Sequence, residues 1–226
     1  MVLKMKRFLS FFLVVLLPSL AYASDRGDVR LDGHMGFNQT YGLYGGAALS
    51  SSFDVCGFLE FDSSVRYSSF GRTALDIRPS WFKPLPSGRL SAGVLAHYVY
   101  QNHTDDFCFG AGAGLELRWF RADLGYYCRV MSAGGSSVTE PFNLYYEFAF
   151  SCLPDVENWD LHAILSNCRP AQLERLHQPC VALECIFYPS SSVGIVLSAD
   201  YRRTGILHVS SMFYQFYGSL GVKFRW

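Results

Sequence analysis

Half of the 226 residues are hydrophobic, 16% are aromatic and 17% are charged. The 19 basic and 19 acidic residues give a formal net charge of zero, which argues against a chain built to bind nucleic acid or an anionic surface. Beyond the N-terminal segment no run approaches about 18 uninterrupted apolar residues, so the pattern excludes a helical membrane protein. The length suits a single β-barrel domain.

Residues 1–23 have the organisation of an export signal. Three basic residues precede an apolar run over 8–17, and an A-x-A cleavage site ends at Ala23. The apolar run is too short for a transmembrane anchor. We predict that 1–23 are removed and that 24–226 form one domain. Loss of three basic residues leaves this domain with 16 basic and 19 acidic residues, a net charge of −3.

The rest of the chain repeats one theme, a segment of about ten residues with alternating hydrophobicity that ends at a turn signal. In the clearest segment, 107–119, one parity is apolar and the other holds glycines, Glu116 and Arg118. Residues 29–50 form either one long strand or two short ones. Further strands are predicted at 54–68, 72–83, 89–101, 107–119, 121–131, 142–152, 158–168, 180–188, 193–203 and 211–226.

The turn signals divide the connections into two classes. Short turns are predicted near 84–88, 120–121, 153–158 and 188–192, and longer polar connections near 102–106, 131–141, 168–179 and 204–210. Because both chain ends of an outer-membrane barrel face the same side, the strand number must be even. We predict an all-β, transmembrane, antiparallel up-and-down β-barrel of eight to twelve strands, with ten to twelve favoured.

The same alternation would suit a soluble sandwich or a lipocalin-like barrel with its apolar face inward. The tryptophans favour the inverted, transmembrane arrangement. Trp81 and Trp119 each end a predicted strand before a short turn, and Trp159 begins one after a short turn. Trp226 ends the chain. All four are therefore predicted on the apolar face at one end of the barrel, as an aromatic girdle at a membrane interface.

The last strand carries the strongest signal for location. Its apolar parity runs at every second residue from Tyr214 to the C-terminal tryptophan, and the opposite parity is polar or small. This ending resembles the closing strand of bacterial outer-membrane β-barrels, in which a terminal aromatic residue with alternating apolar residues is the assembly signal. The resemblance implies the cell outer membrane as location, with its lipids and the barrel-assembly machinery as partners. The residues assigned to the signal are Leu220, Val222, Phe224 and Trp226.

Nearly every charge within a predicted strand lies on the parity that a transmembrane barrel turns toward its lumen. Two interpretations stay open: a salt-bridge network that fills a narrow lumen, or a charged constriction that selects solutes. Eight strands favour the first, because side chains fill so small an interior, whereas twelve leave room for a gap. The predicted network consists of Glu60, Asp62, Arg66, Asp76, Arg78, Glu116, Arg118, Asp123, Arg129, Glu147, Asp200, Arg202, Lys223 and Arg225.

Cysteine and histidine give weaker signals. Cys168 and Cys180 flank one predicted connection and are the candidate disulfide, although the count of seven cysteines leaves at least one thiol over. His208 beside Ser210 is the nearest approach to a hydrolytic pair, and one such pair is common by chance. No metal-binding spacing is present, so we predict neither a metal site nor a cofactor nor catalytic residues.

The run from Phe109 to Trp119 alternates glycine and alanine before Leu115, and its glycines lie in mid-strand rather than between a strand and a helix. It resembles strands of the small outer-membrane barrels of the OmpA, OmpX and OmpW type. The OmpW resemblance implies a narrow, porin-like channel for small or hydrophobic solutes. The alternative is a surface interaction protein whose loops bind host factors, and a lipid-modifying enzyme comes third.

Overall fold

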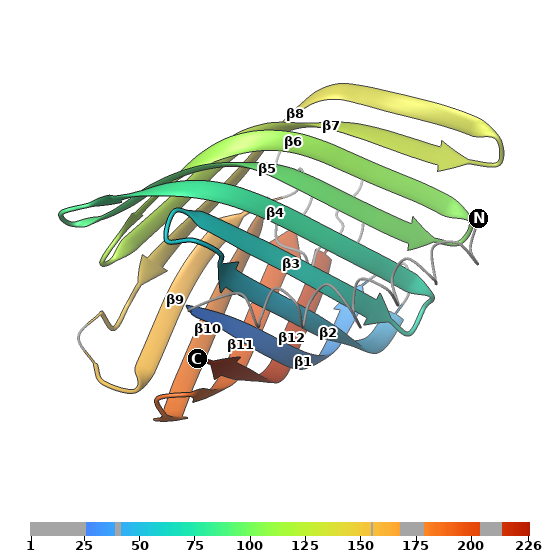
Figure 1. Cartoon of the computed structure of the whole chain (residues 1–226). Helices are drawn as coiled ribbons and strands as arrows, with labels where there is room; N and C mark the ends of the chain where they lie inside the picture. Colours follow the sequence, from blue (N-terminus) through green and yellow to red (C-terminus); the bar gives the residue numbers. More distant parts are fainter. Residues whose placement is uncertain (1–25, 39–41, 155, 168–178, 204–213) are drawn as a thin grey trace.

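A computed structural model of the chain describes residues 26–38, 42–154, 156–167, 179–203 and 214–226. They form a closed barrel of antiparallel strands (Figure 1). The strands are β1 (Arg26–Asn38), β2 (Gly42–Asp54), β3 (Leu59–Ser68), β4 (Arg72–Leu85), β5 (Gly88–Gln101), β6 (Thr104–Leu117), β7 (Phe120–Ala133), β8 (Ser136–Ser151), β9 (Trp159–Ser166), β10 (Cys180–Ser190), β11 (Val193–Arg203) and β12 (Tyr214–Arg225). The predicted signal segment, 1–23, lies outside the described residues and stays a prediction.

Each strand pairs with its neighbours in the sequence, and β1 closes the ring against β12. That seam runs from Asp28 opposite Arg225 to Asn38 opposite Gln215. It brings the C-terminus beside the start of β1 (Figure 1), where Gly27 and Trp226 exchange two backbone hydrogen bonds of 3.1 and 3.3 Å. We call this end of the barrel the terminal end. The number twelve is even, as predicted, and the region 29–50 supplies two strands rather than one.

The predicted strand at 54–68 begins too early. β2 continues to Asp54, and residues 55–58 form a turn before β3. The Asp54 carboxylate accepts a 2.8 Å hydrogen bond from the Gly57 amide, and Gly57 has a φ of 74°. An aspartate side chain that accepts from a backbone amide and a glycine at positive φ favour a turn. They outweigh the alternation that had assigned Val55 to the apolar face of a strand.

Two connections predicted to be long are two-residue turns. β5 and β6 meet at Asn102 and His103, with φ of 48° and 63°, and β7 and β8 meet at Gly134 and Gly135, with φ of 57° and 85°. Positive φ at both central positions is the geometry of the tightest hairpins, so the strands extend into the regions 102–106 and 131–141. The short turn predicted at 120–121 is instead formed by residues 118–119.

The two faces of the wall differ as a transmembrane barrel requires. Alternate positions such as Leu183, Leu197 and Leu220 are apolar, point outward and are more than half exposed. Trp81, Trp119, Trp159 and Trp226 are also exposed, at 42–56%, and all lie at the terminal end in strand ends or a turn. Within the described residues, no helix is long and apolar enough to cross a membrane. The fold is that of a transmembrane β-barrel, with charge and small polar groups facing the lumen.

Candidate functional site in the barrel lumen

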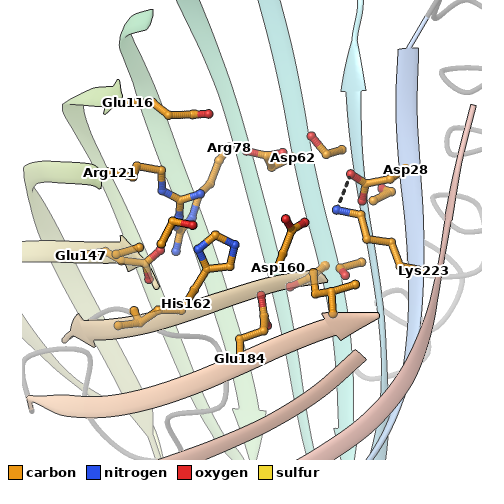
Figure 2. Close-up of a pocket in the computed structure, with 18 of the residues that line it drawn as sticks. Asp28, Asp62, Arg78, Glu116, Arg121, Glu147, Asp160, His162, Glu184 and Lys223 are labelled. Carbon is orange, nitrogen blue, oxygen red and sulfur yellow. Dashed lines mark hydrogen bonds and ion pairs between the residues drawn. The ribbon is translucent and has the colours of Figure 1, made fainter. Parts of the chain in front are cut away.

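The half of the lumen nearest the terminal end contains a cavity of about 530 Å³, which we call the vestibule (Figure 2). Its wall holds seven carboxylates, four basic side chains and one histidine, an excess of three negative charges with the histidine neutral. The acidic residues are Asp28, Asp62, Asp76, Glu116, Glu147, Asp160 and Glu184, and the basic ones are Arg78, Arg118, Arg121 and Lys223, with His162 beside them. Figure 2 labels ten of these residues, whose side chains point into the cavity from several strands of the barrel.

The vestibule is open because much of its wall is made of small side chains. Ser50 and Ser52 of β2, Ser64 of β3, and Ala149 and Ser151 of β8 all line it. A barrel of this strand number encloses more space than short side chains can fill. The sequence of the wall therefore sets the size of this cavity, within the diameter that twelve strands allow.

The ion pairs of the vestibule join different strands. Arg89 of β5 contacts Glu60 of β3 and Glu116 of β6, each at 2.8 Å. Arg121 of β7 contacts Asp123 at 2.9 Å and also Glu147 of β8. Lys223 pairs with Asp28 at 3.0 Å across the β1–β12 seam, as the dashed line in Figure 2 marks. Because β4 separates β3 from β5, the Arg89–Glu60 pair spans a strand.

Beyond the vestibule, large side chains meet across the lumen in what we call the packed layer. Gln215 donates a 2.7 Å hydrogen bond to the Tyr44 hydroxyl, and the rings of His34 and Tyr217 lie 5.2 Å apart. The layer consists of His34, Tyr44, Arg66, Arg72, Asp76, His97, Arg129, Asp200, Arg202, Gln215 and Tyr217. Three of its arginines, Arg72, Arg129 and Arg202, are no more than 5% exposed, so the side chains of this layer are closely packed.

Charges in the packed layer are held at short range. Nδ1 of His97 lies 2.6 Å from the Asp76 carboxylate, which also accepts a 3.1 Å hydrogen bond from Ser64. Arg129 donates to Asp106 at 2.6 Å. At the boundary with the vestibule, Arg30 bridges Asp32 and Glu184, both at 2.7 Å, and so links β1 to β10. A buried charge is stable only when paired in this way.

Glycines in β6 and β7 make room for tyrosine rings that lie on the wall. A Cβ atom at Gly112 would come within 2.0 Å of the Tyr145 hydroxyl, and one at Gly110 within 2.7 Å of the Tyr127 side chain. Tyr127 is fully buried in a cluster with Leu95 and Cys108. The G-x-G-x-G run thus serves packing in the lumen, and nothing in its position corresponds to a phosphate-binding loop.

The structure places most of the predicted network on the lumen face. Asp62, Arg78, Glu116, Glu147 and Lys223 line the vestibule, and Glu60 and Asp123 form the ion pairs with Arg89 and Arg121 described above. Asp76 lies where the vestibule meets the packed layer, which holds Arg66, Arg129, Asp200 and Arg202. Arg118 lies in the turn after β6 rather than in a strand, at the vestibule mouth. Arg225 lies at the rim, where its Nε donates to the Ser191 carbonyl and its guanidinium covers the Tyr188 ring at 4.1 Å.

Sequence reasoning missed several lumen charges. Arg30 and Asp32 lie in the region 29–50 that was left undivided, although Leu31 and Met35 on the opposite parity already marked the outward face. Arg72, Arg89, Arg121, Asp160 and Glu184 lie within predicted strands, where parity alone could have assigned them to the lumen. Asp28, Asp106 and Glu140 lie one or two residues outside predicted strands.

Other residues singled out in the sequence lie outside the described part of the chain. Cys168 is outside the described residues, so its disulfide with Cys180 stays a prediction. His208 and Ser210 are outside them as well. In the described part of the chain, no group of three or more metal-ligating side chains could hold a metal ion.

Comparison with known proteins bears on the fold. Neither protein-family models nor the curated proteins give a match. Among solved structures, the NanC porin matches with a TM-score of 0.56 at 10% identity, over 86% of this chain and 98% of its own. The KdgM porin in complex with disordered oligogalacturonate matches with a TM-score of 0.54 at 9% identity, over the same shares. The likeness is one of fold. Both are outer-membrane porins, whereas the expected resemblance to the OmpA, OmpX and OmpW type stays an expectation.

Proposed function

We propose that this chain is an outer-membrane protein whose lumen is a narrow channel for small polar solutes. The observation that carries the proposal is a closed twelve-stranded wall around a charged cavity of about 530 Å³. A lumen lined by fixed charges of both signs replaces part of the hydration shell of a polar solute, as selective pores do. Hydrophobic solutes, the other class that the sequence suggested, would meet no apolar path through such a lumen.

The packed layer supports a low conductance and a strict size limit. Its side chains are joined by hydrogen bonds and ring contacts rather than by a folded plug domain within the described residues. Because the layer consists of side chains, it can open for a small solute by changes of rotamer, without any change in the strands of the wall. We therefore assign the packed layer as the constriction and the vestibule as the cavity that a solute occupies next to it.

The proposed location follows from the same architecture. An apolar outer face, a tryptophan girdle and a last strand with Leu220, Val222 and Phe224 pointing outward suit insertion among outer-membrane lipids. We expect export with cleavage after Ala23, and assembly by the barrel-assembly machinery through β12. Because two of the four connections predicted to be long are two-residue turns, the channel is favoured over a surface protein that binds host factors through loops.

Solute flux into liposomes tests the proposal. Refolded protein is inserted into liposomes loaded with impermeant dextran, which are then diluted into isotonic solutions of sugars and amino acids of graded size. We expect swelling with the smallest polar solutes and a steep fall as solute size increases. Swelling that is indistinguishable from that of empty liposomes for every solute would remove the channel function. Inserted protein is verified by its resistance to carbonate extraction.

A further inference from the structure

One lumen residue has a charge that its surroundings do not satisfy. Arg66 projects from β3 into the packed layer, between Ala48 of β2 and Ala74 of β4, which are its register partners. Its Nε and Nη1 atoms are sealed from solvent and have no hydrogen-bond partner among the described residues. A guanidinium group buried in this way needs acceptors.

The other charges near Arg66 increase that need. Arg66 interacts electrostatically with Arg72 of β4, and Arg72 interacts in turn with Arg202 of β11. Three guanidinium groups from three strands therefore gather in one layer. Like charges held together at low dielectric repel one another strongly. Asp76 and Asp106 lie close enough to Arg72 to offset part of this repulsion, and Asp76 also interacts with Arg66.

The carboxylates of the layer are largely committed to other groups. Asp76 accepts hydrogen bonds from His97 and Ser64. Asp106 accepts three hydrogen bonds of 2.6–3.1 Å from Arg129. Asp32 accepts two from Arg30, at 2.7 and 2.8 Å. Asp200 of β11 is a further buried carboxylate of the layer. None of the described carboxylates accepts a hydrogen bond from Nε or Nη1 of Arg66.

We propose that Arg66, with Arg72 and Arg202, forms an oxyanion site at the constriction, which takes the carboxylate or phosphate group of a small solute. The inference rests on the proposed channel, because it names the class of solute that the constriction would hold. A planar guanidinium offers donors in a fork that matches two oxygen atoms of such a group. The bound anion would supply the acceptors that Arg66 lacks and would reduce the repulsion among the three arginines.

The net charge of the vestibule determines from which end of the barrel an anion can approach this site. Its excess of three negative charges disfavours an anion that approaches from the terminal end. We therefore expect anionic groups to reach Arg66 from the opposite end of the barrel. A solute that also carries a positive charge would find favourable charge on the vestibule side of the constriction.

Binding of inorganic phosphate to the refolded barrel in detergent tests the site without any need for conduction. The urea midpoint of unfolding is followed by circular dichroism as phosphate is added, against sodium chloride at equal ionic strength, because salt alone screens charge. We expect a saturable rise of the midpoint with phosphate only. Acetate in a parallel series distinguishes a carboxylate site from a phosphate site by which anion binds more tightly.

Three variants assign the effect to a residue. Arg66→Gln should weaken phosphate binding about ten-fold or more, since charge-assisted hydrogen bonds are lost. Without phosphate this variant should be at least as stable as the parent, because an unsatisfied buried charge is removed. Arg66→Lys should bind with intermediate affinity. Lys223→Gln removes the same charge from the vestibule wall and should leave phosphate affinity unchanged.

Two results would overturn the site: a parent protein whose midpoint responds to neither anion, or an Arg66→Gln variant with the parental response. The outcome is separable from that of the channel itself. Phosphate binding without solute flux would remove the channel and keep the site. Flux without anion binding at Arg66 would keep the channel and remove the site.

Discussion

The two halves of the lumen are enclosed by the same barrel wall, yet one is open and the other is packed with side chains. In the vestibule the wall is built from serine and alanine between the charged residues, as at Ser50, Ser64 and Ala149. In the packed layer the equivalent inward positions hold residues such as Tyr44 and Tyr217. Strand number sets the diameter that is available, and side-chain size decides how much of it stays open.

The halves also differ in how their ion pairs are solvated. The side chains of the Arg89 pairs are 19–44% exposed, whereas Arg129 is 6% exposed and its partner Asp106 is 17% exposed. Exposed pairs contribute little to stability, and the loss of one partner from a buried pair is costly. The ion pairs therefore provide mainly a charged surface in the vestibule, whereas they stabilise the fold in the packed layer.

The largest expected effect contrasts these two arginines. Arg129→Gln should lower the free energy of unfolding by about 3–5 kcal/mol, because it leaves the Asp106 carboxylate buried without its partner. Arg89→Gln should cost about 1 kcal/mol or less, since water reaches Glu60 and Glu116. Urea titrations of the two refolded variants against the parent measure both changes. Equal losses would mean that the two halves are solvated alike.

A second prediction concerns the glycines of β6 and β7 against which the tyrosine rings pack. Gly112→Ala should destabilise the barrel by about 1–3 kcal/mol, because the new Cβ atom would meet the Tyr145 hydroxyl and the Leu124 carbonyl oxygen. Gly45→Ala is the matched control, since its Cβ would lie 3.4 Å from the His34 carbonyl oxygen and nothing closer. The same urea titration applies. A Gly112→Ala variant as stable as Gly45→Ala would contradict the close packing around Gly112.

The smallest expected effect contrasts two tyrosine hydroxyls. The Tyr127 hydroxyl is buried in the described structure without a hydrogen-bond partner, so Tyr127→Phe should be neutral or slightly stabilising. The Tyr188 hydroxyl is hydrogen-bonded to Asp160 in the vestibule wall, so Tyr188→Phe should cost about 1 kcal/mol. Unfolding midpoints compared in one buffer resolve the two. The opposite order would contradict the hydrogen-bond assignment of both residues.

Alternating hydrophobicity predicted the fold well, because parity in a strand depends only on local sequence. It placed Glu60, Glu147 and Asp200 on the lumen face and the four tryptophans at one end. The turns were predicted less well. Asn102-His103 and Gly134-Gly135 turn within two residues because both positions adopt positive φ, and the sequence offers no sign of that beyond residue type.

Which lumen charges form pairs could not be predicted from the sequence, for a different reason. Arg121 pairs with Asp123 on its own strand, whereas Arg129 of the same strand pairs with Asp106 of β6. The Arg30–Glu184 pair joins strands that are not neighbours in the barrel. Such contacts depend on tilt and curvature of the whole wall, which alternation within one strand does not encode.

Single-channel conductance of two tyrosine variants tests the central claim most directly. Tyr217→Ala removes a ring from the packed layer, and Tyr201→Ala removes the same ring from the outer face, where it contacts Phe216. If the lumen is the solute path and the packed layer is its narrowest point, the first variant should show a clearly larger unit conductance than the parent. The second should match the parent. Equal conductances in all three proteins, or no discrete steps in any, would contradict the account.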